Sequence, residues 1–520
     1  MRRYPLAVVI AVSVALVANI GLTTAQASED ELDVSDFLPS FEGFRWRVSG
    51  IADYGHQLTI SSISVGQETI TYRADGEVDD LSGGESGKDY SLSVSYVVSD
   101  DAMVQRKSGE TMLDSKWDEI ELLRDPIEED ATWQQTVGEG DDATTLSCTI
   151  EDVGGERGER VVKIRYEDVD GPYYEYREIQ EHVGVVGFER LMLDGDEPYE
   201  VTYSTSPEAT VLPPTRDFTD VTEEDWFFSY LGAPQRMGLI RGYPDDTFRP
   251  DSSISVAEFI KTVVSALGYP ATGDGEPWHR PYVGAAEEFG LIESDDFEVY
   301  DRSIRREEMA LLLARAEGTP VRDDGDTSQF SDSHEIGEDF QPYVAHATEK
   351  GLLKGYRDGS FRPEKVMTRA EAVRVLWSLI HNKDHGIFRP EDAVALEGEF
   401  EDRFYQDTIG DEDPLPRVED FDRMDDLVDH LVEIMDRDLA ESYVNDYYEE
   451  RSDRLYLIPK DGPTSLQTEE DFDLSMKTPT RYQLTQEGSS GLVGDYVLTI
   501  TYGQRGDDWI MVDREVEVEE

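Results

Sequence analysis

Two arginines stand where the sequence predicts the first turn of a helix. Arg369 lies in the phrase T-R-A-E over Thr368–Glu371, and Arg306 lies in the run Ile304–Met309. A guanidinium binds a carboxylate through two parallel hydrogen bonds, and the unpaired amides of a first helical turn also favour an anion. Arginines at such positions have the chemistry to hold an acidic ligand.

The residue types that usually carry catalysis are not arranged for it. The chain has 115 acidic residues, so neighbouring carboxylates such as Glu223 and Glu224 have almost no specificity as an acid–base pair. His381 and His385 stand four residues apart, but the sequence indicates no third metal ligand. No G-x-S-x-G phrase, Cys–His pairing or phosphate-binding glycine loop is present. We expect no catalytic residue, no cofactor and no metal site beyond loose calcium binding at Asp323–Asp326 or at the aspartates of the turns.

A repeated phrase precedes the helix that begins near Arg369. Gly242–Pro250 reads G-Y-P-D-D-T-F-R-P and Gly355–Pro363 reads G-Y-R-D-G-S-F-R-P, and a glutamate follows eight residues after each proline. After the first copy, Ser255 and Glu258 have the spacing of a capping box, which predicts a helix start. Two copies of such a turn and helix indicate a repeated structural unit. A third unit between them keeps its aromatic residues and helix start but has lost the turn phrase.

Three units with the phrases F-x-D, G-L-I, G-Y-x-D-x-[TS]-F-R-P and T-R-A-E resemble the S-layer homology domain, present here as a triplet. We divide it into repeat 1 over 216–268, a degenerate repeat 2 over 275–318 and repeat 3 over 328–381. The resemblance implies a central α-helical, pseudo-threefold bundle. It also implies grooves between the units that hold secondary cell-wall polysaccharide, carrying pyruvate ketals, against the peptidoglycan.

The resemblance further implies which residues bind this polymer. The positions that match the family's motif are Arg369, Arg306, Trp226, Trp278, Asp220 and Asp332. The arginines would pair with acid groups of the polymer, and the tryptophans would stack on sugar rings. Repeat 1 has Val256 in place of the arginine, and no repeat keeps every element. The turn phrases themselves are expected to be structural.

Both flanks of the repeats read as folded domains, so the predicted fold class is multidomain. The segment 37–206 alternates apolar and polar residues, as in Val161–Tyr166, which predicts an antiparallel all-β domain, either a sheet or an open barrel. We interpret 382–415 as an acidic linker. Residues 416–520 combine an amphipathic helix within Arg417–Tyr443 with several strands, which predicts a small α+β domain similar to the cystatin-like or NTF2-like class.

The composition describes a folded and very acidic protein. The hydrophobic fraction is 38% and the net charge is -68. Such a surface repels nucleic acid and anionic lipid, and it is typical of a protein that stays soluble in concentrated salt, so we expect a halophilic source. Residues 216–380 hold 18 basic and 32 acidic residues and are about half as acidic per residue as the rest. That difference favours binding of an anionic polymer in this region.

The N-terminus predicts export. Residues 1–27 combine two arginines, an apolar run over Leu6–Ala18 and an A-x-A site, which is typical of a secretory signal peptide. No later apolar run approaches the roughly 20 residues of a membrane span. We expect a secreted, noncatalytic protein of the cell wall or S-layer, able to self-associate in a surface layer. The alternative is a wall-active enzyme or enzyme regulator anchored in the same way, with its active domain in 37–206 or 416–520.

Overall fold

The computed structural model describes most of the chain after the predicted signal peptide. The described residues are 32–50, 55–79, 89–108, 112–193, 198–205, 212–271, 276–383, 385–406, 408–409, 415–460, 462–490 and 494–518. The signal peptide predicted over 1–27 lies outside them. None of the described helices is long and apolar enough to cross a membrane.

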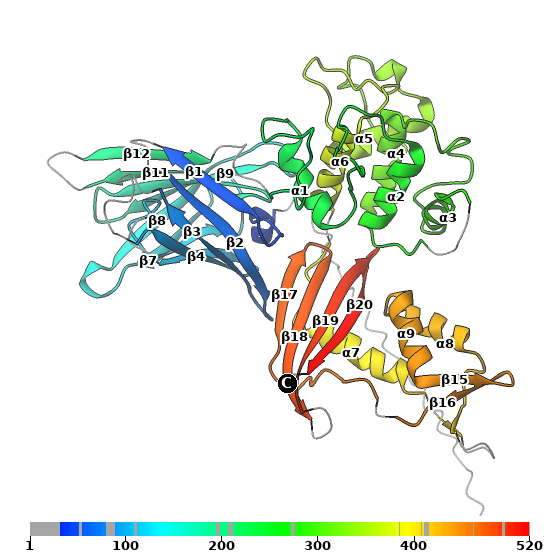
Figure 1. The fold of residues 1–520 in the computed structure, drawn as a ribbon. Coiled ribbons are helices and arrows are strands. Elements are labelled where there is room, and N and C mark those ends of the chain that lie inside the picture. Colours follow the sequence, from blue (N-terminus) through cyan, green and yellow to red (C-terminus); the bar gives the residue numbers. More distant parts are fainter. Residues whose placement is uncertain are drawn as a thin grey trace, which may run out of the picture. The chain divides into compact units, whose positions relative to one another are not determined.

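The N-terminal domain is an antiparallel, barrel-like sheet (Figure 1). Its strands are β1 (Arg45–Gly50), β2 (Gly55–Val65), β3 (Ile70–Val78), β4 (Ser91–Val98), β5 (Ala102–Ser108), β6 (Glu119–Arg124), β7 (Thr132–Val137), β8 (Thr144–Gly154), β9 (Val161–Asp168), β10 (Tyr174–Gln180), β11 (Gly184–Met192) and β12 (Tyr199–Thr205). Short 3-10 helices cover Val34–Phe37 and Gly140–Asp142. The predicted antiparallel all-β domain is therefore confirmed.

The order of the strands is that of a sheet whose two ends approach each other. It runs β7-β8-β9-β10-β11-β12-β1-β2-β3-β4-β5-β6, so strands that adjoin in sequence, β6 and β7, stand at its two ends. The side chain of Gln135 joins those ends, because its carbonyl accepts the amide N–H of Glu121 at 2.8 Å and its amide donates to the carbonyl of Glu121 at 2.8 Å. Alternate residues along β4 are buried, as expected for a sheet with one apolar face.

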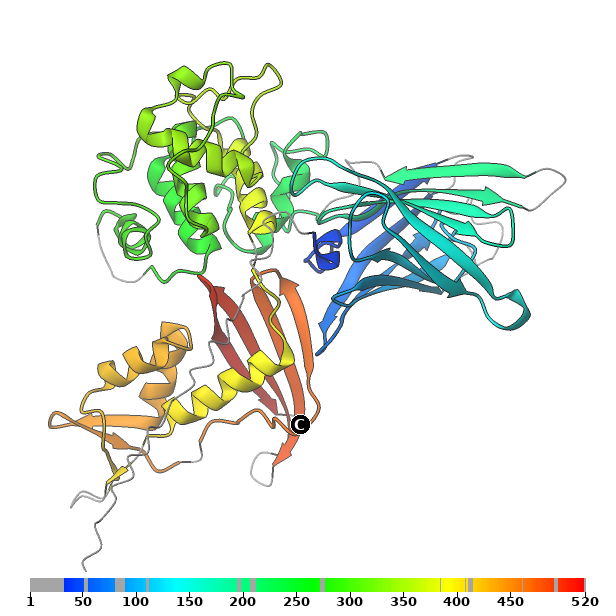
Figure 2. The same ribbon diagram turned by 180° about the vertical axis from the view of Figure 1, so that it is seen from behind.

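The C-terminal region packs helices against a second set of antiparallel strands. The strands are β17 (Asp473–Thr478), β18 (Arg481–Ser490), β19 (Gly494–Arg505) and β20 (Asp508–Val518), and the helices are α7 (Pro390–Phe404), α8 (Met424–Val432) and α9 (Arg437–Tyr447). A small sheet contains β13 (Thr408–Ile409), β14 (Arg417–Val418), β15 (Tyr448–Arg451) and β16 (Arg454–Leu457). Figure 2 shows α7 crossing the face of β17–β20. Strand β17 also pairs with β2 at Ser475 and Ser64, so the two sheets are continuous.

Two sequence expectations differ from this region of the structure. Residues 382–415, expected to be an acidic linker, contain α7, which buries Leu396, Phe400 and Phe404 and one acid, Glu397, while most of its other acids are exposed. The single amphipathic helix expected within Arg417–Tyr443 is divided into α8 and α9. Helix α8 ends at Val432, and residues 434–436 then bond to β20 before α9 begins. There the amide of Met511 donates to the carbonyl of Ile434 at 2.9 Å.

The central region consists of short and long helices in alternation. The short helices are α1 (Phe228–Arg236), α3 (Arg280–Glu288) and α5 (Gln341–Glu349), the long ones are α2 (Val256–Ala266), α4 (Arg306–Glu317) and α6 (Arg369–Asn382), and 3-10 turns cover Ser333–Glu335 and Glu338–Phe340. Helices α2 and α6 begin with a capping box, and α4 keeps the glutamate half of one, in which the Glu308 carboxylate accepts the Arg305 amide at 2.9 Å. The predicted box is confirmed in α2, where the Ser255 hydroxyl accepts the Glu258 amide at 3.2 Å and the Glu258 carboxylate accepts the Ser255 amide at 2.9 Å.

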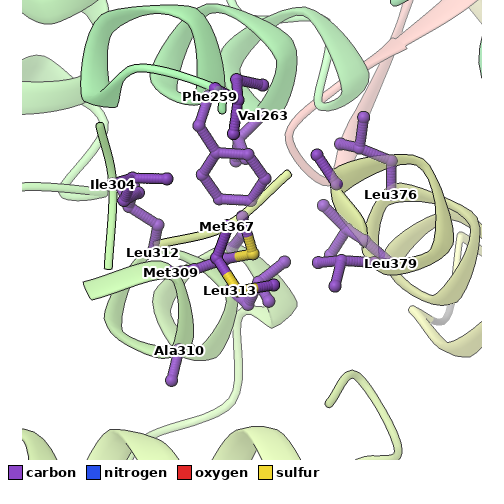
Figure 3. Close-up of a cluster of buried hydrophobic side chains, with 14 of the residues drawn as sticks. Phe259, Val263, Ile304, Met309, Ala310, Leu312, Leu313, Met367, Leu376 and Leu379 are labelled. Atoms are coloured by element: carbon purple, nitrogen blue, oxygen red, sulfur yellow. The ribbon is translucent and has the colours of Figure 1, made fainter. Parts of the chain in front are cut away.

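The three long helices begin close together and share one core. The extended residues that precede them bridge each other at Ser253–Thr368, Ser255–Ser303 and Arg305–Val366. Beyond these bridges the apolar side chains of α2, α4 and α6 converge (Figure 3). Each short helix packs against a long helix of a different repeat, α1 on α6, α3 on α2 and α5 on α4. The predicted repeats are therefore interleaved, and the contact of α1 with α6 joins the first repeat to the last.

Candidate functional site

The two intact turns are held by the aspartates of the F-x-D phrases. The carboxylate of Asp332 accepts the amide N–H groups of Phe361 and Arg362, both at 2.7 Å. Asp220 accepts the equivalent amides of the first turn at 2.7 and 2.8 Å. Arg362 has a φ of 59°, in the left-handed region that a non-glycine residue rarely adopts, so the carboxylate secures an unfavourable bend. Both aspartates predicted to bind the polymer thus stabilise a turn.

The predicted arginine of repeat 3 contacts the turn of repeat 1. Arg369 donates through Nε to the carbonyl of Phe248 at 2.9 Å and through Nη2 to the carbonyl of Arg241 at 3.1 Å. Its guanidinium also lies 5.1 Å from the centroid of the Tyr243 ring. Arg369 is partly exposed, so packing between repeats occupies part of its hydrogen-bonding capacity and leaves the rest of the side chain at the surface.

The predicted arginine of repeat 2 makes the same contact one repeat further on. Arg306 donates to the carbonyl of Lys354 and lies 4.9 Å from the centroid of the Tyr356 ring. It is 6% exposed, so it packs inside the interface. In repeat 1 the residue at this position is Val256, whose backbone amide donates to the carbonyl of Arg302 at 3.0 Å. The first residue of each long helix therefore links its own repeat to the next.

The two predicted tryptophans are exposed. Trp226 is 59% exposed just before α1, and Trp278 is 47% exposed just before α3. The ammonium of Lys261, on α2, lies 5.8 Å from the Trp278 ring centroid and 5.2 Å from that of Tyr282. A sugar that stacks on an exposed ring beside a cation can also present an acid group to that cation.

A second cation and aromatic pair occurs where α1 packs on α6. The guanidinium of Arg374 lies 4.9 Å from the ring centroid of Tyr230 and 5.3 Å from that of Trp377. Sequence reasoning missed Lys261 and Arg374. A signal was present, because each stands five positions after the first residue of its long helix. The equivalent residue of α4 is Leu311, and at this third interface Arg315 instead lies 5.1 Å from the Tyr343 ring centroid and pairs with Asp296.

His381 and His385, whose spacing suits a metal ligand pair, make contacts with backbone carbonyls instead. Nδ1 of His381 lies 2.8 Å from the carbonyl of Trp377, and Nε2 of His385 lies 2.8 Å from the carbonyl of Ile380. Burial holds the pKa of His381 well below its usual value, and the neighbouring His182 acts in the same direction. Within the described part of the chain, no group of three His, Cys, Asp or Glu side chains is placed to hold a metal ion.

The repeats match a known family. The S-layer homology domain model matches residues 217–260 and 329–373, within the predicted repeats 1 and 3. The chain therefore contains S-layer homology domains at these two places. Repeat 2 lies between the matches. Its assignment rests on the sequence phrases and on the common arrangement of α3 and α4.

Several curated proteins resemble part of the chain. An endoglucanase of Bacillus sp. (strain KSM-635) is 26% identical over 174 residues, which are 31% of this chain and 18% of the enzyme. The middle cell wall protein of Brevibacillus brevis is 27% identical over 20% of this chain and 11% of its own length. A cellulosome-anchoring protein of Acetivibrio thermocellus is 27% identical over 28% of this chain and 36% of its own length. The chain thus spans less than a fifth of the first relatives it matches. Together with the domain matches, these proteins point to the cell surface or cell wall.

Proposed function

We propose that this is a secreted, noncatalytic protein of the cell envelope. Its S-layer homology repeats bind secondary cell-wall polysaccharide on the peptidoglycan, and the β-rich and C-terminal domains are displayed at the cell surface. Support comes from the two domain matches and from relatives named as wall and anchoring proteins. Self-association in a surface layer belongs to the same proposal.

The observation that carries the proposal is the placement of cations beside aromatic rings at two interfaces between the repeats. Lys261 stands beside Trp278 and Tyr282, and Arg374 stands beside Tyr230 and Trp377. Aromatic faces suit sugar rings, and cations select polymers with acid groups, such as pyruvate ketals. In a chain of net charge -68, these positive groups give the repeats a local preference for an anionic polymer.

The test is binding of the full chain to purified wall sacculi before and after the polysaccharide is removed. We expect binding that depends on the polysaccharide and that weakens about tenfold when Trp278→Ala and Lys261→Ala are combined, since both side chains are at the surface and their contacts with the polymer are lost. Tyr405→Ala is a matched control, because Tyr405 is an aromatic residue of the C-terminal region with 48% exposure. Unchanged binding to stripped sacculi would refute the polysaccharide as the ligand.

An anchored enzyme or enzyme regulator is the second candidate. One relative is named as an endoglucanase, although the match covers 18% of that enzyme. In the C-terminal region, a cavity of about 420 Å³ between α7 and the loop before β17 is lined by Glu401, Glu469 and Glu470 among others. Release of soluble wall fragments by the wild type, and its loss in Glu401→Gln, would favour this candidate over a noncatalytic role.

A further inference from the structure

A hairpin of the β-rich domain reaches the cations of repeat 3. Residues 155–160 connect β8 to β9. There the carboxylate of Glu159 accepts hydrogen bonds from Nζ of Lys354 at 2.7 Å and from Nη2 of Arg374 at 2.9 Å. Glu156 adds an ion pair with Lys354 at 2.9 Å. Two carboxylates from one domain therefore neutralise two cations of another.

The backbones of the hairpin and of repeat 3 pack closely against each other around these ion pairs. Gly158 is buried against α6, and a Cβ atom added to it would lie 2.2 Å from Oδ1 of Asn382. Across the contact, a Cβ atom on Gly351 would lie 2.8 Å from the carbonyl oxygen of Arg157. Both glycines have positive φ, so each is favoured by the bend as well as by the lack of space. The backbone of the hairpin is thus complementary in shape to this surface, in addition to the attraction between the charged side chains.

The two cations that the hairpin covers resemble the lysine and arginine side chains proposed above to bind the acid groups of the polymer. Lys354 directly precedes the turn of repeat 3, and Arg374 lies on α6 beside Tyr230. Repeat 1 has an equivalent pair. Arg241 directly precedes its turn, and Lys261 has the same position in α2 as Arg374 has in α6. Both residues are exposed. Repeat 2 has Glu293 and Leu311 at these positions, so no comparable pair exists there. One of the two cationic pairs is therefore open and the other is occupied by the hairpin.

We infer that the hairpin over 155–160 is an internal carboxylate ligand that occupies the cationic pair of repeat 3, and that an acidic wall polymer must displace it to bind there. The inference rests on the proposed function. The carboxylates of Glu156 and Glu159 take the place of acid groups on the polymer. Ion pairs that are partly exposed, as here with Lys354 at 31% and Glu159 at 35%, are weak and screened by salt, so the hairpin can be displaced. Polymer would bind first at Arg241 and Lys261 and then compete for Lys354 and Arg374.

The first measurement tests the hairpin contact without any polymer. Glu156→Gln combined with Glu159→Gln in the full chain removes both charges and keeps the size of the side chains. We expect amide hydrogen exchange over 155–160 to become about fivefold faster or more, as the loss of partly exposed ion pairs implies. The matched control combines Glu151→Gln with Glu167→Gln, two carboxylates that pair with Arg165 on the adjoining strands. Equal exchange in the two variants would overturn the inference.

The second measurement tests competition. With sacculi that carry the polysaccharide, we expect the Glu156→Gln, Glu159→Gln variant to bind with a Kd about fivefold lower than the wild type at low salt, and with a similar Kd in 1 M salt. Faster exchange with an unchanged Kd at low salt would show that the hairpin does not compete, which also overturns the inference. If neither wild type nor variant binds sacculi, the proposed function fails while the exchange measurement still reports on the hairpin.

Discussion

Arg369 and Phe248 belong to different repeats, yet Nε of Arg369 donates to the carbonyl of Phe248 at 2.9 Å, across 121 residues of chain. The first residue of the last long helix therefore closes onto the turn of the first repeat. Arg306 makes the equivalent contact between repeats 2 and 3. Because of these links, we expect the three repeats to unfold together.

Arg369→Ala should destabilise the repeats. It removes donors from the carbonyls of Phe248 and Arg241, and we expect the free energy of unfolding to fall by about 1–3 kcal/mol, measured by urea denaturation. Lys261→Ala is the matched control, because Lys261 is exposed and its loss should cost less than about 0.5 kcal/mol. If Arg369→Ala abolishes wall binding at unchanged stability, direct contact with the polymer is the better explanation.

Asp332→Ala should loosen the turn of repeat 3. The carboxylate accepts two backbone amides at 2.7 Å, and its removal leaves both donors unpaired beside a residue in the left-handed region. We expect a loss of about 2 kcal/mol in the free energy of unfolding and faster hydrogen exchange over Gly355–Pro363. Asp339→Ala, at an exposed position nearby, serves as the control and should change neither quantity. Equal behaviour of the two variants would contradict this role of Asp332.

His56 should make the β-rich domain sensitive to acid. Burial lowers the pKa of His56 from 6.5 to about 4, although the carboxylate of Asp114 acts in the opposite direction. Between these values the unfolded chain binds a proton that the folded chain does not, so stability falls as the pH drops from 6.5 towards 4, by about 3 kcal/mol for this group.

His56→Gln should flatten that part of the pH profile. The measurement is urea denaturation followed by the fluorescence of the domain at pH 7, 6, 5 and 4.5. The exposed His334 supplies the control His334→Gln, which should keep the wild-type profile. A His56→Gln profile parallel to that of the wild type would show that another group causes the acid sensitivity.

The buried ion pair of the C-terminal region should behave as a unit. Arg514, on β20, donates to both carboxylate oxygens of Glu397, on α7, at 2.6 and 2.7 Å, and both side chains are almost fully buried. Arg514→Met leaves a buried carboxylate without its partner and should cost about 3–5 kcal/mol, measured by thermal and urea unfolding. Adding Glu397→Leu should recover most of that loss. Additive losses in the double variant would contradict the coupling of the two residues.

Local features of the fold could be predicted from the sequence. The capping box of Ser255 and Glu258 was predicted because it depends on residues three positions apart, and its hydrogen bonds are present. The alternating pattern of Val161–Tyr166 predicted a strand, which is part of β9. The hydrogen bond from Met511 to Ile434, in the break between α8 and α9, could not be predicted, because it joins residues far apart along the chain.

In the candidate site too, some features depend on residues close together in the sequence and others on residues far apart. The sequence by itself determined that the chain carries S-layer homology repeats, which residues match the family's motif, and where the long helices begin, since these depend on residue types at short spacing. Only the tertiary structure decided that Asp220 and Asp332 bind turns, that Arg306 and Arg369 link one repeat to the next, and that Glu159 covers Lys354 and Arg374. Those contacts join residues from 28 to 215 positions apart, and they form only when the packed repeats and the β-rich domain bring distant backbone and charges together.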